Sequence, residues 1–424
     1  MRNTRILLVV AVVAVLAVTF GQAVSAKTVI QYWTLFTGPD GKYMEQMGNR
    51  FNQENPDIEV RMQVYSGDQY LNKLTLGVRT GTAPDVAVLY DSIMPRFIEN
   101  NSLEVLNDAL RSVGIEPTDY HPLLWEKVVF DGKVYGIPLG SYSLGLYYNK
   151  DLFKAAGLDP NRPPTTLEEF IEYGKRLTVD KNGKHPGEEG FDYNSVEQWG
   201  IAVVGGWQPR QLWQWLTTLF QNGGTVMDPV MTKATFYTPE GIEALRVWVD
   251  FIYKYRIAPD KVADPELLFM TKKIGMHMNG PWMVNAFMEK GLNFGAAPVP
   301  LFGKQHATWA GTHILVLPRQ RDRSRIQAAL RFVDWLTEHS LDWAKAGQVP
   351  ARLSVLESRE FKALPVQSAF ARQLDYVRFE QPNERNNEIA NRLIAAIEDA
   401  LLNRKTPEQA LKEAAEAVNS ILSR

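Results

Sequence analysis

An alternation of strand and helix patterns near the start of the chain constrains the fold most. A short apolar run of β type covers residues 29–33, and a helical pattern over residues 43–51 follows a loop of glycine, proline and aspartate. Residues 58–64 alternate as a strand, residues 69–79 have helical periodicity, and residues 86–90 are continuously apolar. Strands alternating with helices of this length indicate βαβ units and a parallel sheet, so we predict an α/β fold.

A second α/β region follows. Its predicted strands cover residues 144–148, 201–204, 274–278, 294–299 and 313–317, and its predicted helices cover residues 167–177, 212–220, 242–253, 389–402 and 407–422. The chain has no internal repeat and no low-complexity linker between the two regions. Several short crossings should therefore join them, and such crossings behave as a hinge.

The predicted strands of the first region end in polar and aromatic residues. The first strand ends at Trp33, the second at Tyr65 and the third at Tyr90 and Asp91. Ligands of open α/β sheets bind beyond the carboxyl ends of the strands. These side chains should therefore share one rim of a binding site.

The N-terminus has the pattern of an export signal. Arg2 and Arg5 precede an apolar run over residues 6–18, and the small residues of Val24-Ser25-Ala26 follow. A membrane anchor is the alternative, but this run is shorter than the ~20 apolar residues of a spanning helix. We expect a signal peptide over residues 1–26, cleavage after Ala26, and a periplasmic or extracellular protein. The chain has 0 Cys, which excludes disulfides, thiolate metal sites and a cysteine-linked lipid.

The charge pattern does not suit a polyanionic partner. Removal of Arg2 and Arg5 changes the formal net charge from −2 to −4, and no block of Lys and Arg occurs. We therefore expect no nucleic acid partner.

Common catalytic and metal-binding motifs are absent. The chain lacks a phosphate loop, a dinucleotide glycine fingerprint, a nucleophile elbow and a zincin motif. Adjacent acids such as Glu168-Glu169 and Glu188-Glu189 point in different directions, so they do not flank one glycosidic bond. The 6 His are scattered, and the loop that starts at Asp180 lacks the later ligands of a calcium site. We expect no enzymatic activity, no cofactor and no metal.

Tryptophan is unusually informative in this chain, which has 11 of them. Sugars stack their C–H faces on aromatic rings and need polar partners at their edges. Ligand stacking is favoured for the tryptophans beside Gly or Pro or at a strand end, which are Trp33, Trp207, Trp282 and Trp309. Core packing is favoured for those in helical patterns, which are Trp248, Trp335 and Trp343. Trp213 and Trp215 share one helix, so at least one must pack inward, while Trp125 and Trp199 stay unassigned.

Several short motifs resemble those of a known family. They are Arg50-Phe51-Asn52 with Asn55-Pro56, Gly81-Thr82-Ala83-Pro84-Asp85, Tyr147-Tyr148-Asn149-Lys150-Asp151-Leu152-Phe153 with Ala156-Gly157-Leu158, Gly280-Pro281-Trp282, Asn293-Phe294-Gly295 with Pro298 and Pro300, and Gly347-Gln348-Val349-Pro350-Ala351-Arg352. In this order and spacing they resemble the extracellular solute-binding proteins of carbohydrate ABC transporters, of the family 1 or maltose-binding-protein-like type. The resemblance covers nearly the whole mature chain.

This resemblance implies a two-lobed periplasmic-binding-protein-like type II fold with a three-crossing hinge. The crossings would lie near Ser141, Val299 and Leu336. The implied N-terminal lobe covers residues 27–141 plus 300–336, and the implied C-terminal lobe covers residues 142–299 plus 337–424.

The resemblance also implies ligand roles. Asp91 would hold sugar hydroxyls, Tyr142 would lie on the hinge side, and Trp282 would be a stacking platform. Gly311 would let the backbone approach the ligand, and Arg352 would reach into the site. As alternatives, Arg352 pairs with a surface carboxylate and Asp91 caps the following helix. With the strand-end and tryptophan arguments, the predicted ligand-binding set is Trp33, Tyr65, Asp91, Tyr142, Trp207, Gly280, Trp282, Trp309, Gly311 and Arg352.

The resemblance implies a monomeric protein that binds a sugar and delivers it to the membrane permease of an ABC transporter. An oligosaccharide is the favoured ligand. The first loop has no Lys before Asp40, which departs from the maltose-binding relative. Glycerol-3-phosphate or a related polyol phosphate is the alternative ligand, for which Arg352 and Arg385 would supply the positive charge. A secreted carbohydrate-active enzyme and a sensor lobe that serves a receptor are further alternatives.

Overall fold

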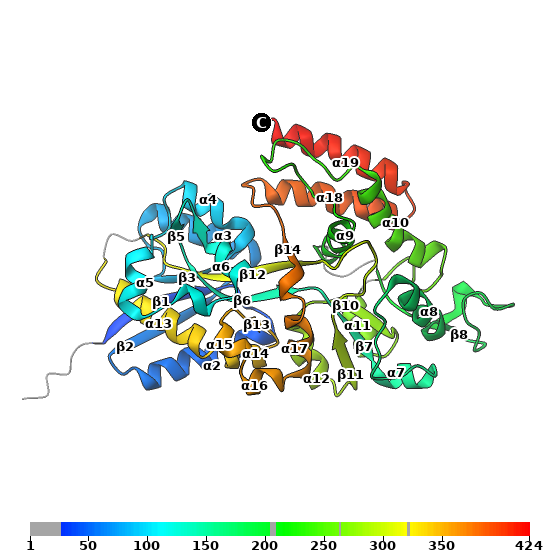
Figure 1. Cartoon of the computed structure of the whole chain (residues 1–424), viewed down its shortest axis with the longest axis horizontal. Helices are drawn as coiled ribbons and strands as arrows, with labels where there is room; N and C mark the ends of the chain where they lie inside the picture. The colour runs from blue at the N-terminus through cyan, green and yellow to red at the C-terminus, as the bar shows by residue number, and fades with distance from the viewer. Residues whose placement is uncertain (1–26, 204–208, 263, 320–322) are drawn as a thin grey trace, which may run out of the picture.

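The computed structural model describes residues 27–203, 209–262, 264–319 and 323–424. It has two bodies, each built around its own sheet (Figure 1). The first body contains the blue and cyan start of the chain at the left of Figure 1, and the second contains most of the green middle part at the right. Within the described ranges, no helix is long and apolar enough to cross a membrane.

The first body holds a sheet of seven strands. Six follow the order β13-β6-β12-β3-β1-β2, and β14 pairs with β12. The strands are β1 (Thr28–Thr34), β2 (Ile58–Val64), β3 (Val86–Tyr90), β6 (Ile137–Ser143), β12 (Thr308–Val316), β13 (Val349–Pro350) and β14 (Val377–Phe379). Strand β1 is parallel to both β2 and β3, which confirms the predicted parallel unit. Strand β12 runs antiparallel to β3 and β6.

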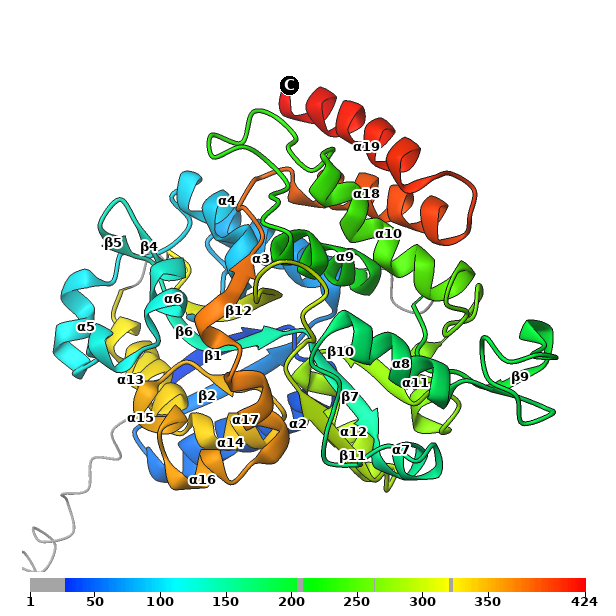
Figure 2. The same cartoon turned by 45° about the vertical axis from the view of Figure 1, so that its right-hand side comes forward.

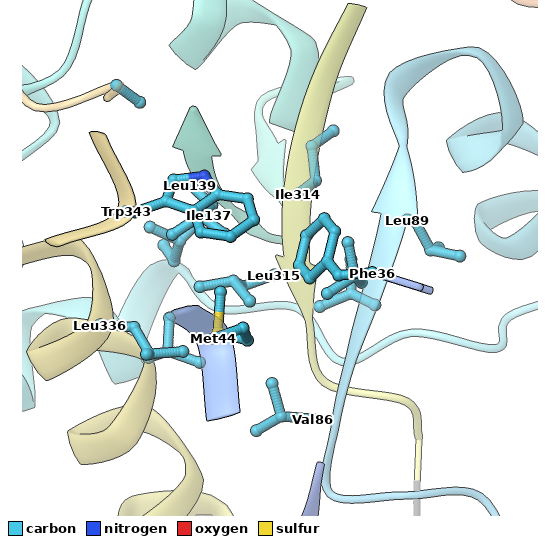
Figure 3. Close-up of a cluster of buried hydrophobic side chains, with 14 of the residues drawn as sticks. Phe36, Met44, Val86, Leu89, Ile137, Leu139, Ile314, Leu315, Leu336 and Trp343 are labelled. Carbon is cyan, nitrogen blue, oxygen red and sulfur yellow. The ribbon is translucent and has the colours of Figure 1, made fainter. Parts of the chain in front are cut away.

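Helices cover both faces of this sheet. They are α2 (Pro39–Glu54), α3 (Gly67–Thr80), α4 (Met94–Glu99), α5 (Asn107–Val113), α6 (Pro122–Trp125), α13 (Ile326–Glu338), α14 (Ser340–Lys345), α15 (Leu353–Leu356), α16 (Arg359–Lys362) and α17 (Pro365–Ala371). Figure 3 shows how Met44 of α2 and Leu336 of α13 meet the strand residue Leu315 in the core. The predicted core tryptophans Trp335 and Trp343 are buried there.

The second body holds a sheet of three strands. Strand β7 (Gly145–Asn149) lies between β10 (Met276–Asn279) and β11 (Phe294–Ala297), antiparallel to both. Its helices are α7 (Lys150–Ala155), α8 (Leu167–Leu177), α9 (Pro209–Gln221), α10 (Pro239–Tyr253), α11 (Pro265–Met270), α12 (Val284–Glu289), α18 (Asn386–Leu401) and α19 (Pro407–Leu422). Helices α9, α10, α18 and α19 pack on one another (Figure 2).

The predicted strand over residues 201–204 is wrong for its described residues, 201–203. The N–H groups of Gly200 and Ile201 both donate to the carbonyl oxygen of Ile257, after helix α10. The chain just before this segment meets the residues around the start of β10, through a bridge between Trp199 and Ile274 and the bond from the Met276 N–H to the Gly200 oxygen. The Ile201 N–H turns toward Ile257 instead and pairs with no strand.

In the described part of the chain, three passages connect the two bodies. Leu144 joins β6 to β7 directly, and residues 298–307 join β11 to β12. Beyond Leu336 the chain stays with the first body, because Val349 of β13 pairs with Ser141 of β6. We therefore place the third passage after β14, where the chain leads into α18, rather than near Leu336.

Candidate ligand-binding site

Six aromatic rings from both bodies meet beside these passages. We call them the aromatic cluster, and they are Tyr90, Tyr142, Trp213, Trp282, Trp309 and His313. Tyr90 ends β3, Tyr142 belongs to β6, and Trp309 and His313 belong to β12, whereas Trp213 comes from α9 and Trp282 from the turn after β10. The sequence therefore brings rings from two separate sheets to one place.

Tyr142 and Trp213 connect the cluster. The Tyr142 ring centroid lies 5.8 Å from that of Trp309 and 6.1 Å from that of Trp282. Trp213 stacks on Trp309 with a centroid distance of 4.0 Å and an angle of 14° between the planes, and its ring lies 5.9 Å from Trp282. Three of the predicted site residues, Tyr142, Trp282 and Trp309, are thus brought together.

Two of the predicted glycines make room for these rings. A Cβ atom on Gly311 would lie 2.3 Å from the Tyr142 hydroxyl oxygen, since the two residues face each other across β12 and β6. A Cβ atom on Gly280 would lie 1.9 Å from the Trp282 ring. The space beside Gly311, which the sequence assigned to a ligand, is filled by Tyr142.

Asp91 lies beside the cluster as a buried carboxyl group. Its side chain is only 7% exposed, and Oδ1 accepts a hydrogen bond of 2.9 Å from the Thr312 backbone N–H. This bond ties the end of β3 to β12. Burial raises the pKa of Asp91 to about 7, and the Thr312 hydrogen bond opposes that rise.

Glu380, which follows β14, is a second acidic group at the cluster. Its Oε1 accepts a hydrogen bond of 2.8 Å from Trp309 Nε1. Burial raises the pKa of Glu380, the Trp309 bond opposes the rise, and the charge of Glu380 in turn raises the pKa of Asp91. The cluster is therefore edged by two carboxyl groups.

His313 is a neutral member of the cluster. Its ring lies 4.6 Å from Tyr142, and burial lowers its pKa to about 3. It therefore adds no positive charge near neutral pH.

Trp33 and Tyr65 form a separate pair at the ends of β1 and β2. Their centroids lie 5.2 Å apart, and the Lys73 ammonium lies 4.7 Å above the Tyr65 ring. The Trp33 Nε1 group is buried and has no hydrogen-bond partner in the described part of the chain. A ligand role for this pair stays a prediction.

Arg352 lies in another network. Its guanidinium pairs with Asp334 and donates from Nε to the hydroxyls of Tyr120 and Thr337, both at 3.2 Å. These contacts match the alternative in which Arg352 pairs with a carboxylate. Arg385 donates to the backbone oxygen of Ile421. Trp207 lies outside the described residues.

Trp213 and Glu380 were not in the predicted set. Trp215 is fully buried, and a side chain two residues away on a helix points to another face, so Trp213 points elsewhere. This spacing could have identified Trp213 as a candidate site residue. Glu380 belongs to no motif, and its partner Trp309 is 71 residues earlier in the sequence. No local pattern marks such a contact.

No described group of three His, Cys, Asp or Glu side chains could hold a metal ion. The carboxylate of Asp180 accepts backbone N–H groups from Asn182, Lys184 and Asp192. These bonds use both of its oxygens to shape a turn.

The fold matches solved structures of binding proteins over nearly the whole chain. An ABC substrate-binding protein, Lmo0181 of Listeria monocytogenes in complex with cycloalternan, is 23% identical with a TM-score of 0.78, covering 94% of this chain and 99% of that one. The maltose-bound MalE3 of T. maritima is 23% identical with a TM-score of 0.77, covering 93% and 100%. The fold is thus that of two-lobed periplasmic binding proteins, which confirms the predicted class.

Sequence comparison gives the family. The model for bacterial extracellular solute-binding proteins matches residues 46–367, and the chain belongs to this family. The sn-glycerol-3-phosphate-binding periplasmic protein UgpB of Escherichia coli K12 is 26% identical over 429 residues, covering 94% of this chain and 93% of UgpB. A putative binding protein of Brucella abortus is 25% identical over 405 residues, covering 92% of each chain.

Proposed function

We propose that this protein is the extracytoplasmic substrate-binding subunit of an ABC importer and that it binds a sugar, best an oligosaccharide, at the aromatic cluster. The observation that carries the proposal is the set of rings edged by Asp91 and Glu380. Aromatic faces suit the C–H faces of a sugar, and carboxyl groups suit its hydroxyls. Solved neighbours are described as complexes with cycloalternan and maltose, which supports this ligand class.

The two origins of the rings support a closing mechanism. Tyr142 comes from the first body, and Trp213 and Trp282 come from the second. A sugar that contacts rings of both bodies links the bodies, and it would lose part of these contacts if they moved apart. Because a ligand shifts an equilibrium by its differential affinity for the two states, sugar binding favours the closed form. That form would be the one delivered to the permease.

The charges at the cluster favour a neutral sugar over a phosphate. Asp91 and Glu380 border the rings and would repel a phosphate in their ionised forms, while Lys127 supplies one positive charge that acts on Asp91. Arg352 and Arg385, the cations considered for a phosphate, donate to Asp334 and Ile421. Glycerol-3-phosphate stays the second candidate because several relatives carry that ligand in their names.

Isothermal calorimetry of the mature protein against mono- and oligosaccharides, with glycerol-3-phosphate included, tests the proposal. We expect one-to-one binding of a sugar and an affinity loss of at least about tenfold in Trp282→Ala, since central aromatic contacts dominate binding. Trp199→Ala is the matched control, because Trp199 is also half-buried in the second body but contacts Tyr193. Binding of glycerol-3-phosphate alone would replace the sugar assignment, and no binding would refute it.

Export and catalysis have separate tests. The mass of the secreted protein should correspond to a chain that starts at Lys27, since we propose cleavage after Ala26. Chromatography should recover bound oligosaccharides uncleaved. A product peak would instead support the alternative of a carbohydrate-active enzyme.

A further inference from the structure

Helix α9 carries two buried glutamines on one face, and one of them is fully hydrogen-bonded whereas the other has no partner among the described residues. Gln214 and Gln221 are seven residues apart, so their side chains lie about 20° apart around the helix axis. Each is 1% exposed. The Gln221 amide is fully used: Oε1 accepts from the N–H groups of Phe302 (2.7 Å) and Gly303 (3.1 Å). Its Nε2 donates to Pro300 O (3.0 Å) and Ala307 O (3.1 Å).

Gln214 has none of these bonds. Both its Oε1 and its Nε2 are buried without a hydrogen-bond partner among the residues that the structure describes. A buried polar group of this kind lowers stability, because it loses water and gains nothing in return. Gln211, one turn earlier, also has a buried Oε1 without a partner there. The start of α9 therefore holds unused hydrogen-bonding groups that its end does not.

Gln214 lies on α9 between two residues that contact Trp309 of the aromatic cluster. Trp213, the neighbouring residue, stacks on Trp309. Thr217, one turn after Gln214 on the same stripe, accepts the backbone N–H of Trp309 at 3.1 Å. Arg210, one turn before it, pairs with Glu266. Gln214 thus lies within one helical turn of residues that contact the aromatic cluster.

We propose that the Gln214 amide is a ligand-binding group, left unpaired in the free protein to bind two adjacent hydroxyls of a neutral sugar. An amide offers donors and an acceptor in one plane, so it can accept from one hydroxyl and donate to the next. A fully ionised phosphate oxygen only accepts and would leave Oε1 unpaired, so the amide would need the hydroxyls, and not the phosphate, of a polyol phosphate. This inference rests on the proposed function and specifies the ligand as one with a vicinal diol.

Gln214→Met and Gln221→Met form a matched pair. Each variant removes one amide from the same face of α9 and replaces glutamine by a side chain of nearly equal length. Two quantities are measured: the urea midpoint of the ligand-free protein, and the affinity for the best sugar of the panel. For Gln214→Met we expect an unchanged or higher midpoint and an affinity at least about tenfold lower. For Gln221→Met we expect a lower midpoint and, for the folded protein at low temperature, an affinity within about threefold of the parent.

A midpoint in Gln214→Met as low as that of Gln221→Met, or a failure to fold, would show that the amide is structural and would overturn the inference. Unchanged sugar affinity in a folded Gln214→Met would also overturn it, while leaving the proposed function intact. A parent protein that binds neither a sugar nor glycerol-3-phosphate would refute the proposed function and the diol assignment together. These outcomes separate the failure of one from the failure of the other.

Discussion

Trp309 and Glu380 form a hydrogen bond of 2.8 Å between the indole Nε1 and Oε1, and it fixes the edge of a ring whose face already stacks on Trp213. The ring is therefore held in two directions by two different parts of the chain. Glu380 in turn accepts a hydrogen bond from Trp309, which offsets part of the free-energy cost of burying its carboxyl group. The side chains that position the site also satisfy each other.

Trp309→Phe tests this relationship. The substitution keeps an aromatic face for Trp213 but removes the donor to Glu380. We expect the free energy of unfolding to fall by about 1–3 kcal/mol, the usual effect of leaving a buried polar group unpaired. Urea unfolding of Trp309→Phe, Glu380→Gln and the double variant gives the coupling energy. Strictly additive effects, within about 0.5 kcal/mol, would show that the bond carries no energy.

Asp91 predicts a pH dependence of stability. Its pKa is about 7 in the folded protein, whereas an aspartate in an unfolded chain titrates near ~3.9. The folded state therefore holds this proton more tightly, and its stability falls as the pH rises from about 4 to 7. Asp91→Asn still accepts from Thr312 but does not titrate. Over that range we expect the variant to gain about 2–4 kcal/mol relative to the parent.

Thermal or urea unfolding across pH 4–8 measures this difference. Parallel profiles for Asp91→Asn and the parent would show that Asp91 titrates normally. Lys127, whose charge lowers the pKa of Asp91, supplies a control: Lys127→Met should extend the parent's decline in stability to a higher pH.

Helical periodicity and continuous apolar runs predicted most of the fold, because amphipathic helices bury one face and central strands such as β3 are buried on both. The strand at residues 86–90 and the helix at residues 167–177 have the bounds that the sequence predicted. Helix α8 begins where Thr166 accepts the Glu169 N–H and shows its apolar stripe clearly. Strand β13 has only two residues, too few for any period, so no pattern marked its pairing with β6, and the third crossing that the resemblance implied near Leu336 was placed too early.

Three residues of the predicted site lie together where local sequence marks them, and their ligand role stays a prediction. Tyr142, Trp282 and Trp309 lie beside strand ends or glycines, which is why tryptophan context found two of them and the family motif found the third. Glu380 is recognised by its hydrogen bond to Trp309, which is distant in sequence. Gln214 is recognised by the lack of any hydrogen-bond partner among the described residues. Such properties follow from packing, and they appear only in the folded structure.

Gly311→Ala should displace Tyr142. The added Cβ atom would lie 2.3 Å from the hydroxyl oxygen and 2.4 Å from Cζ of that ring, so the ring must move. We expect a loss of about 1–3 kcal/mol in stability and weaker sugar binding. Gly48→Ala in α2 is the control, because its Cβ would meet nothing within 4 Å and should stabilise the helix by about 0.5–1 kcal/mol. Equal stability of the two variants would contradict the close approach.

Arg352 offers a test of whether its role is structural or ligand-binding. The side chain is 13% exposed and joins Asp334 and Thr337 of α13 to Tyr120, while Asp119 lies 3.6 Å from its Nη1. Arg352→Met would leave Asp334 without this partner, and we expect a loss of about 1–3 kcal/mol in urea unfolding. Sugar affinity should stay within about twofold, because these contacts lie in a network of their own. A tenfold loss of affinity in a stably folded Arg352→Lys would instead restore the ligand-binding role that the sequence assigned to it.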